Sequence, residues 1–149
     1  MPNEACPLPF EPAHDEESII DRLLAMDRIA IVGLSDHPDR VSYAIGTYLY
    51  RQNKLVIPVN PMHETVMGVK CYPSLQAAPK PIELVNVFRR SEFCADVVRD
   101  AIAVAAKGVW LQSGISNREA RRLAEAAGID YIEDRCIMVE HMRSTRRRR

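Results

Sequence analysis

Short apolar runs, separated by longer segments with helical spacing, dominate the chain. The runs fall at 29–33, 55–59, 83–88, 109–112 and 129–133. A nearly continuous apolar run of this length is typical of a strand that is buried on both faces, as the strands of a parallel sheet are. The sequence therefore predicts five strands, and Pro58 constrains the pairing of the second one.

Helices are predicted between these strands because apolar residues recur there every three or four positions. The first helix is expected to begin in the acidic segment 15–18 and to end near Met26. Ser91 and Asn117 are the expected N-caps of two later helices, which Gly108 and Gly128 are expected to end. The other predicted helices are listed by range: 41–52, 92–106, 118–127 and two short ones at 74–78 and 138–142.

Strand and helix alternate along the chain, which indicates a parallel sheet with right-handed helical crossovers. We expect an α/β, three-layer, doubly wound, Rossmann-like fold with about five strands. In open sheets of this kind, ligands bind outside the carboxyl ends of the strands. This rule selects five loops as candidate functional segments: 33–42, 59–63, 88–91, 112–117 and 134–136.

Length and composition suit one folded domain, since the chain has 149 residues of which 47% are hydrophobic. Four prolines without periodicity predict a disordered or loosely packed arm over residues 1–14, followed by the domain at 15–143 and an Arg-rich tail at 144–149. No apolar run approaches the ~20 residues of a membrane span. The four cysteines have no metal-binding spacing, so we expect a reduced, cytoplasmic protein without a metal site.

Charge is distributed unevenly although the formal net charge is zero. Residues 1–28 contain seven acidic residues against two arginines, and five arginines lie in 143–149. The body between them is balanced, which argues against a general nucleic-acid surface. We therefore expect neither nucleic acid nor membrane as a partner. The sequence does not decide whether the chain forms a homo-oligomer, because no residue pattern supports one.

The loop after the first strand has the chemistry of an anion site. Gly33 permits a tight turn, Ser35 and Ser42 carry hydroxyl donors, and Arg40 adds a positive charge just before a predicted helix. The free N–H groups at a helix N-terminus attract anions, so a phosphate or pyrophosphate is the expected ligand. The alternative is that Gly33 only ends a strand and Ser42 only caps a helix.

This loop does not carry the G-x-G-x-x-G fingerprint of dinucleotide-binding folds. Position 35 is Ser, and Gly46 is too far along to complete the motif. Asn60 and Pro61 stand at the end of the second strand, where such folds place an acidic residue for the ribose. These two departures argue against NAD as the ligand without excluding it. An NAD(P)- or other nucleotide-dependent enzyme is therefore the alternative to a binding module.

Two further loops carry candidate ligand contacts. Arg89 and Arg90 follow Phe88 at the end of the third strand, where two guanidinium groups suit an anion. The alternative is a solvated pair at a helix start. Gln112 follows the fourth strand, and Gly114 permits close backbone approach by a ligand.

Cys136, Glu140 and His141 could be combined as a nucleophile with a base. A packing cysteine beside a surface histidine explains the same residues more simply, so no catalytic residue is assigned.

The segments IAIVGLSDHPDRVSYAIGTYL, VIPVNP, VNVFRR, VWLQSGI and DRCIMVEH resemble the small, single-domain CoA-binding proteins of bacteria and archaea. That family is similar in fold to the N-terminal CoA-binding domain of the succinyl-CoA synthetase alpha subunit. The resemblance covers about residues 17–143. It implies coenzyme A or an acyl-CoA as the ligand, and no ligase activity, because the synthetase also needs a second domain and a partner subunit.

The resemblance also implies where the ligand lies. The diphosphate is expected over the first loop, the adenosine beside the end of the second strand, and the pantetheine along the end of the third. The implied and candidate contact residues are Gly33, Leu34, Ser35, Arg40, Ser42, Asn60, Pro61, Phe88, Arg89, Arg90, Gln112 and Gly114.

Overall fold

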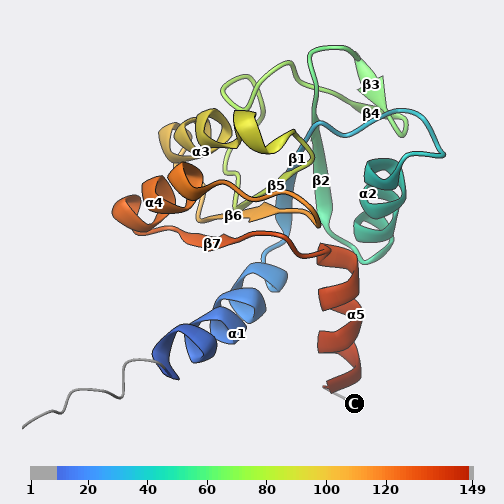
Figure 1. Ribbon diagram of the computed structural model, residues 1–149. Helices are drawn as coiled ribbons and strands as arrows, with labels where there is room; N and C mark the ends of the chain where they lie inside the picture. Colours follow the sequence, from blue (N-terminus) through green and yellow to red (C-terminus); the bar gives the residue numbers. More distant parts are fainter. Residues whose placement is uncertain (1–9, 148–149) are drawn as a thin grey trace, which may run out of the picture.

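The main sheet of the protein has five parallel strands. The computed structural model describes residues 10–147 (Figure 1). The strands lie in the order β2-β1-β5-β6-β7. Their bounds are β1 Arg28–Val32, β2 Leu55–Val59, β5 Leu84–Val87, β6 Gly108–Leu111 and β7 Asp130–Ile132.

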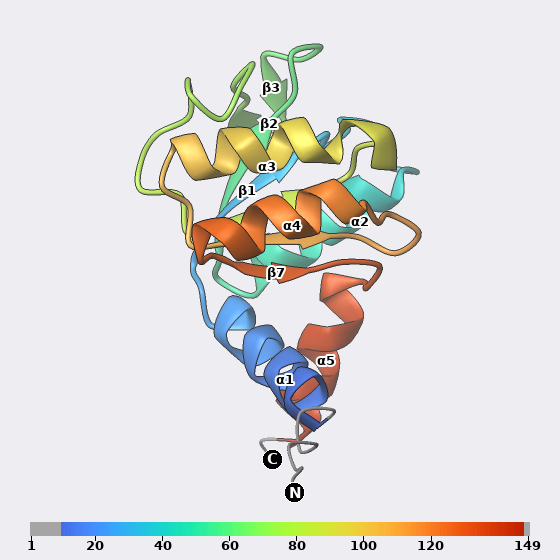
Figure 2. The same ribbon diagram turned by 60° about the vertical axis from the view of Figure 1, so that its left-hand side comes forward.

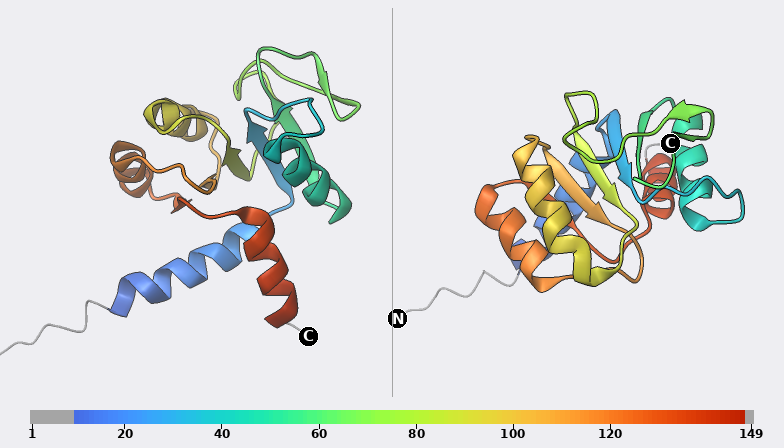
Figure 3. Two further views of the ribbon diagram at one scale, coloured as in Figure 1. Left: turned by 45° about the vertical axis from the view of Figure 1, so that its right-hand side comes forward. Right: turned by 90° about the horizontal axis from the view of Figure 1, so that it is seen from above.

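Helices cover both faces of this sheet and complete three layers (Figure 3). One face packs against α1 (Phe10–Leu24), α2 (Val41–Arg51) and α5 (Ile137–Arg147). The other packs against α3 (Cys94–Ala103), which follows the 3-10 turn η1 (Ser91–Phe93), and α4 (Arg118–Ala127). The predicted Rossmann-like α/β fold is confirmed.

Alternation along β1 explains why its sequence is apolar throughout. Ile29 and Ile31 belong to the core under α1, α2 and α5, whereas Ala30 and Val32 belong to the core under α3 and α4. Both faces of a parallel strand are buried in this architecture, which favours apolar side chains along the whole strand.

The connection between β2 and β5 contains a small hairpin that periodicity did not predict. Strands β3 (Thr65–Val66) and β4 (Val69–Lys70) pair antiparallel across Met67 and Gly68, whose φ values are 58° and 75°. Two-residue strands are too short to produce a visible pattern.

The prediction of a helix at 74–78 was wrong. The segment forms turns, in which the Ser74 hydroxyl accepts the backbone N–H of Ala77 at 3.2 Å.

Both terminal helices are longer than the sequence predicted. Helix α1 begins at Phe10 rather than near residue 15, so residues 10–14 of the arm that was predicted to be disordered or loosely packed are helical. Helix α5 continues to Arg147 instead of ending near Met142, and Ser144 is buried within it. The rest of the predicted arm and tail, residues 1–9 and 148–149, lies outside the described residues.

The acidic and basic ends of the chain meet in space. Helices α1 and α5 lie beside each other below the sheet (Figure 2). Arg147 pairs with Glu17 and Asp21 at 3.7 and 3.1 Å, and Arg135 pairs with Glu16 at 3.2 Å. The uneven charge of the sequence therefore supports an intramolecular contact.

The helix-end signals were right for α4 and wrong for the helix after β5. The Asn117 side chain accepts the backbone N–H of Ala120 at 2.8 Å, and Gly128 ends α4 with φ 75°. Ser91 does not cap a helix; its hydroxyl accepts the backbone N–H of Ser116 at 3.2 Å.

Across residues 10–147, no helix has the length and apolar character that a bilayer crossing demands.

Candidate functional site

The strand order creates a crevice at the carboxyl end of β1. The chain passes from β1 to β2 on one side and later returns to β5 on the other side. The segment after β1 leads to α2 on one face of the sheet, whereas the segment after β5 leads to α3 on the other face. The point where these two segments diverge is the switch point at which open α/β sheets bind ligands.

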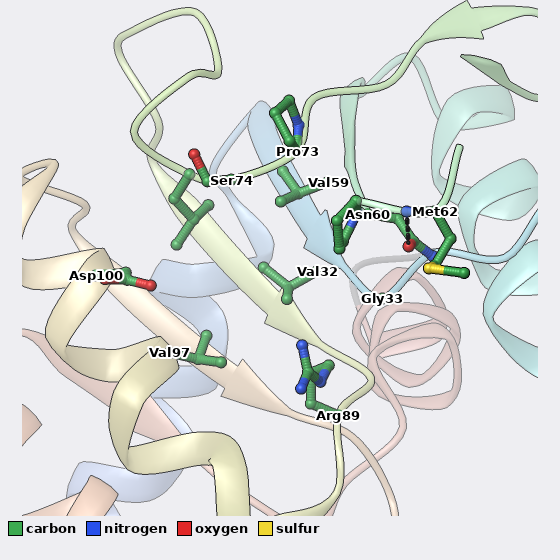
Figure 4. Close-up of a pocket in the computed structure, with 12 residues that line it drawn as sticks. Val32, Gly33, Val59, Asn60, Met62, Pro73, Ser74, Arg89, Val97 and Asp100 are labelled. Carbon is green, nitrogen blue, oxygen red and sulfur yellow. Dashed lines mark hydrogen bonds between the residues drawn. The ribbon is translucent and has the colours of Figure 1, made fainter. Parts of the chain in front are cut away.

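Two cavities occupy this crevice and share Gly33. The larger, of about 480 Å³, is walled by the ends of β1 and β2, the 73–75 loop, Arg89 and the inner side of α3 (Figure 4). The smaller, of about 320 Å³, is walled by the loop after β1, the start of α2 and Phe88. The two cavities together are the candidate site, and one glycine lines both of them.

Position 33 requires glycine for two reasons. Its φ is 88°, in the left-handed region that side chains disfavour. A side chain here would also run into the carbonyl group of Phe88. The Gly33 N–H donates to the Val59 carbonyl at 2.8 Å, which ties the turn to the end of β2.

The two serines of the first loop hold its shape through their hydroxyl oxygens. Ser42 is buried inside the first turn of α2, where its hydroxyl accepts the backbone N–H of Ser35 at 3.0 Å. The Ser35 hydroxyl accepts the backbone N–H of His37 at 3.0 Å. Ser42 therefore organises the loop and does not cap helix α2. Arg40 occupies the N-cap position of α2, and no side chain caps this helix.

Asn60 joins the loops that follow β1 and β2. Its amide nitrogen donates to the Leu34 carbonyl at 3.1 Å. Its amide oxygen accepts the Met62 N–H at 2.9 Å, the bond drawn in Figure 4. The Leu34 side chain is fully buried, so only its backbone faces this junction. Pro61 lines the larger cavity next to Asn60.

Arg89 points into the larger cavity (Figure 4). Its guanidinium carbon lies 4.8 Å from the ring centroid of Phe93. Within residues 16–147, no carboxylate pairs with Arg89 or with Arg40. Both cations are therefore available to an anion. Arg90 is exposed and lines neither cavity.

The far wall of the larger cavity has the opposite charge. Asp100 of α3 lines it and accepts the Gln76 side-chain N–H at 3.0 Å. The sequence pattern did not predict that four further residues line this cavity, because none of them follows the carboxyl end of a strand: Asp100, Ser74, Leu75 and Val97. Only the packing of α3 and of the 73–75 loop over the sheet brings them to the site.

Gln112 and Gly114 do not line either cavity. Gln112 is buried, and its side-chain oxygen accepts the Ile137 N–H at 3.3 Å at the start of α5. Gly114 has φ 81°, and its N–H donates to the Asp134 carboxylate at 2.7 Å. The structure uses both residues to join the end of β6 to the segment after β7.

The cysteines near the site are suited to packing. Burial raises the pKa of Cys94 to about 11 and raises the pKa of Cys71 as well. Both remain thiols at neutral pH, and a thiol is a weak nucleophile.

Glu140 and His141, which the sequence combined with Cys136, both contact other residues. Glu140 pairs with Arg135 at 3.4 Å, and His141 shares a 2.7 Å hydrogen bond with the Tyr48 hydroxyl. No cluster of three or more His, Cys, Asp or Glu side chains suited to a metal ion occurs in the part of the chain that the structure describes.

Comparison with known proteins identifies the family to which the chain is related. The family model described as the CoA binding domain matches residues 27–142. An uncharacterized protein of Bacillus subtilis, YneT, is 41% identical over 114 residues, which cover 76% of this chain and 84% of that protein. The alpha subunit of an ADP-forming acetate–CoA ligase II from Pyrococcus furiosus is 28% identical over 73% of this chain, but only 26% of its own length is covered.

Solved structures show the same fold. A hypothetical protein from Pyrococcus horikoshii has a TM-score of 0.82 at 37% identity, with 95% of this chain and 98% of that chain covered. The dinucleotide-forming acetyl-coenzyme A synthetase 1 of Ca. Korarchaeum cryptofilum has a TM-score of 0.65 at 25% identity, with 77% of this chain and 28% of that one covered. With a family model matching most of its length, this chain belongs to the CoA binding domain family.

Proposed function

We propose that this protein binds coenzyme A or an acyl-CoA in the crevice at the carboxyl ends of β1, β2 and β5. The observation that carries the proposal is the junction at Gly33. Both cavities are lined by Gly33, and an uncapped helix start adjoins one of them. Each cavity is also lined by one arginine, Arg40 in the smaller and Arg89 in the larger, and neither arginine has an ion pair within residues 16–147.

The diphosphate is assigned to the smaller cavity. Gly33 lines this cavity together with Val41 and Ser42, the first two residues of α2, and no side-chain hydrogen bond caps the start of this helix. Backbone N–H groups at a helix start, together with a nearby arginine, form a favourable environment for phosphate oxygens. Arg40 supplies that cation and is exposed to solvent, so it can adjust to the ligand.

The rest of the ligand is assigned to the larger cavity. Asn60 and Pro61 border the adenosine, and Arg89, in the segment that follows Phe88, borders the pantetheine. The wall formed by Val32, Val59 and Val97 is apolar, which suits the base and the hydrocarbon parts of the chain.

The local chemistry favours CoA over NAD. Asn60 stands where a ribose-binding carboxylate would be needed, and its amide is already engaged with Leu34 and Met62. The ligases among the relatives are far longer than this chain, which spans about a quarter of the Pyrococcus furiosus subunit. Their activity is therefore not part of the proposal, which is limited to binding.

Isothermal titration calorimetry of the purified protein with CoA, acetyl-CoA, NAD⁺ and pantetheine tests the proposal. We expect saturable binding of CoA, weaker binding of NAD⁺, and a rise of the melting temperature with CoA concentration, because a ligand that binds only the folded state stabilises it. Absence of heat and of any thermal shift at millimolar CoA would overturn the proposal.

A further inference from the structure

We infer that Phe93 positions Arg89 for the anionic ligand of the larger cavity. This inference rests on the proposed function and extends it from the residues that line the cavity to one that lies behind them. Phe93 is not among the residues that line either cavity.

The backbone around Arg89 is fixed from two directions. The Phe93 N–H donates to the Arg90 carbonyl at 2.9 Å, and this bond closes the turn that directly follows Arg89. From the neighbouring loop, the Asn117 side-chain nitrogen donates to the Ser91 carbonyl at 2.8 Å. The segment that leaves β5 therefore has little freedom, and only the long arginine side chain remains to be oriented.

The Phe93 ring supplies that orientation. The guanidinium carbon of Arg89 lies 4.8 Å from the ring centroid, a distance at which a cation is attracted to the face of an aromatic ring. A guanidinium group that stacks on a ring keeps its N–H donors free at its edge. Figure 4 shows the side chain directed into the cavity, so these donors are presented to the ligand.

No competing carboxylate holds Arg89, as no ion pair to it occurs within residues 16–147. Without the ring, the side chain would be free to adopt many conformations, and ligand binding would have to select one of them. Ordering a long side chain on binding weakens affinity, and a side chain that is ordered beforehand avoids that loss.

The location of Phe93 argues against a role in core packing. Its relative exposure is 38%, and it belongs to neither of the two hydrophobic cores. An aromatic side chain with this much exposure keeps a surface that a cation can contact.

A double-mutant cycle tests this inference, with the dissociation constant for CoA measured by calorimetry. The variants are Phe93→Leu, Phe93→Tyr, Arg89→Gln and the combination of Phe93→Leu with Arg89→Gln. Tyr50→Leu is the matched control, because Tyr50 is an exposed aromatic residue near the far end of α2. Melting temperatures confirm that each variant is folded, and Phe93→Met replaces Phe93→Leu should the latter fail to fold.

We expect Phe93→Leu to raise the dissociation constant about two- to fivefold, as the loss of one solvent-exposed cation–π contact predicts. Phe93→Tyr should keep wild-type affinity because its ring is retained. In the Arg89→Gln background, Phe93→Leu should have no further effect, and Tyr50→Leu should have none in either background.

Several results would overturn the inference. Equal effects of Phe93→Leu with and without Arg89 would show that the ring acts through the fold instead. Unchanged affinity in Phe93→Leu, or a loss in Phe93→Tyr as large as in Phe93→Leu, would also contradict it while leaving CoA binding intact. A wild-type protein that does not bind CoA would overturn the proposed function and this inference together.

Discussion

Gly33 and Phe88 approach so closely that a β-carbon on Gly33 would lie 2.6 Å from the Phe88 carbonyl oxygen. This contact joins the ends of β1 and β5 at the point where the two cavities meet. A glycine at this position lets two loops of the candidate site pack backbone against backbone.

Gly33→Ala should therefore damage both stability and binding. The left-handed φ alone costs about 1–3 kcal/mol for a residue with a side chain, and the clash with Phe88 adds to it. Gly114→Ala is the matched control, because Gly114 also has a positive φ but a β-carbon there would meet nothing within 4 Å. Urea denaturation and CoA titration of both variants check this; equal losses in the two would contradict the role given to the Phe88 contact.

The arginine at the start of α2 should matter more for CoA binding than the arginine at its end. Arg40 lines the smaller cavity, whereas Arg51 lies in the last turn of the same helix, toward the opposite edge of the sheet. Arg40→Gln should raise the dissociation constant for CoA about tenfold, which corresponds to the loss of one charge-assisted hydrogen bond to phosphate. Arg51→Gln should leave it unchanged, and similar effects of the two would refute the placement of the diphosphate.

Asn86 offers a test of the core rather than of the site. It lies in β5 between Ile31 and Trp110, it is fully buried, and neither polar atom of its amide has a hydrogen-bond partner within the described chain. An unpaired buried amide costs free energy, so Asn86→Val should raise the free energy of unfolding by about 1–2 kcal/mol.

Chemical denaturation of Asn86→Val measures this change, and Asn86→Asp is the opposite control because it buries an ionisable group. A less stable Asn86→Val protein would show that the amide has a favourable partner after all.

Glu83 makes stability depend on pH. Its carboxylate accepts the backbone N–H groups of Arg28 and Asp27 at 2.9 and 2.8 Å, and these hydrogen bonds hold its pKa below the ordinary value for glutamate. The stabilisation is complete above the unfolded pKa of about 4.3 and is lost as the pH falls through the lower folded pKa.

Glu83→Gln should thus lower the free energy of unfolding by about 1 kcal/mol at pH 7, and this difference should shrink below pH 4. Denaturation curves from pH 3 to pH 8 measure it, with Glu92→Gln as the control at an exposed carboxylate without an ion pair in residues 16–147. A difference between wild type and Glu83→Gln that does not vary with pH would contradict this account.

Local sequence signals were sufficient for the fold and for part of the candidate site. Nearly continuous apolar runs identified all five strands of the main sheet, because strands buried on both faces favour apolar residues, and Asn86 of β5 is a buried exception. Asn117 and Gly128 marked the ends of α4 because capping chemistry depends only on neighbouring residues. Gly33, Asn60 and Arg89 were found because they follow strands whose carboxyl ends meet at one edge of the sheet.

Other features depended on contacts between distant segments, which no local pattern encodes. Asp100 and Ser74 enter the site only because α3 and the 73–75 loop pack over the larger cavity. Gln112 looked like a ligand contact by position, but tertiary packing turned its side chain to the start of α5.

The sequence by itself determined the strands, their parallel arrangement and the edge at which a ligand would bind, since burial and capping act over a few residues. The tertiary structure decided which polar groups near that edge are free. Ser42 and Asn60 are engaged by neighbouring loops, whereas Arg40 and Arg89 keep unpaired guanidinium groups within residues 16–147. It also brought the acidic start of the chain against its basic end, because α1 and α5 pack beside each other on the same face of the sheet.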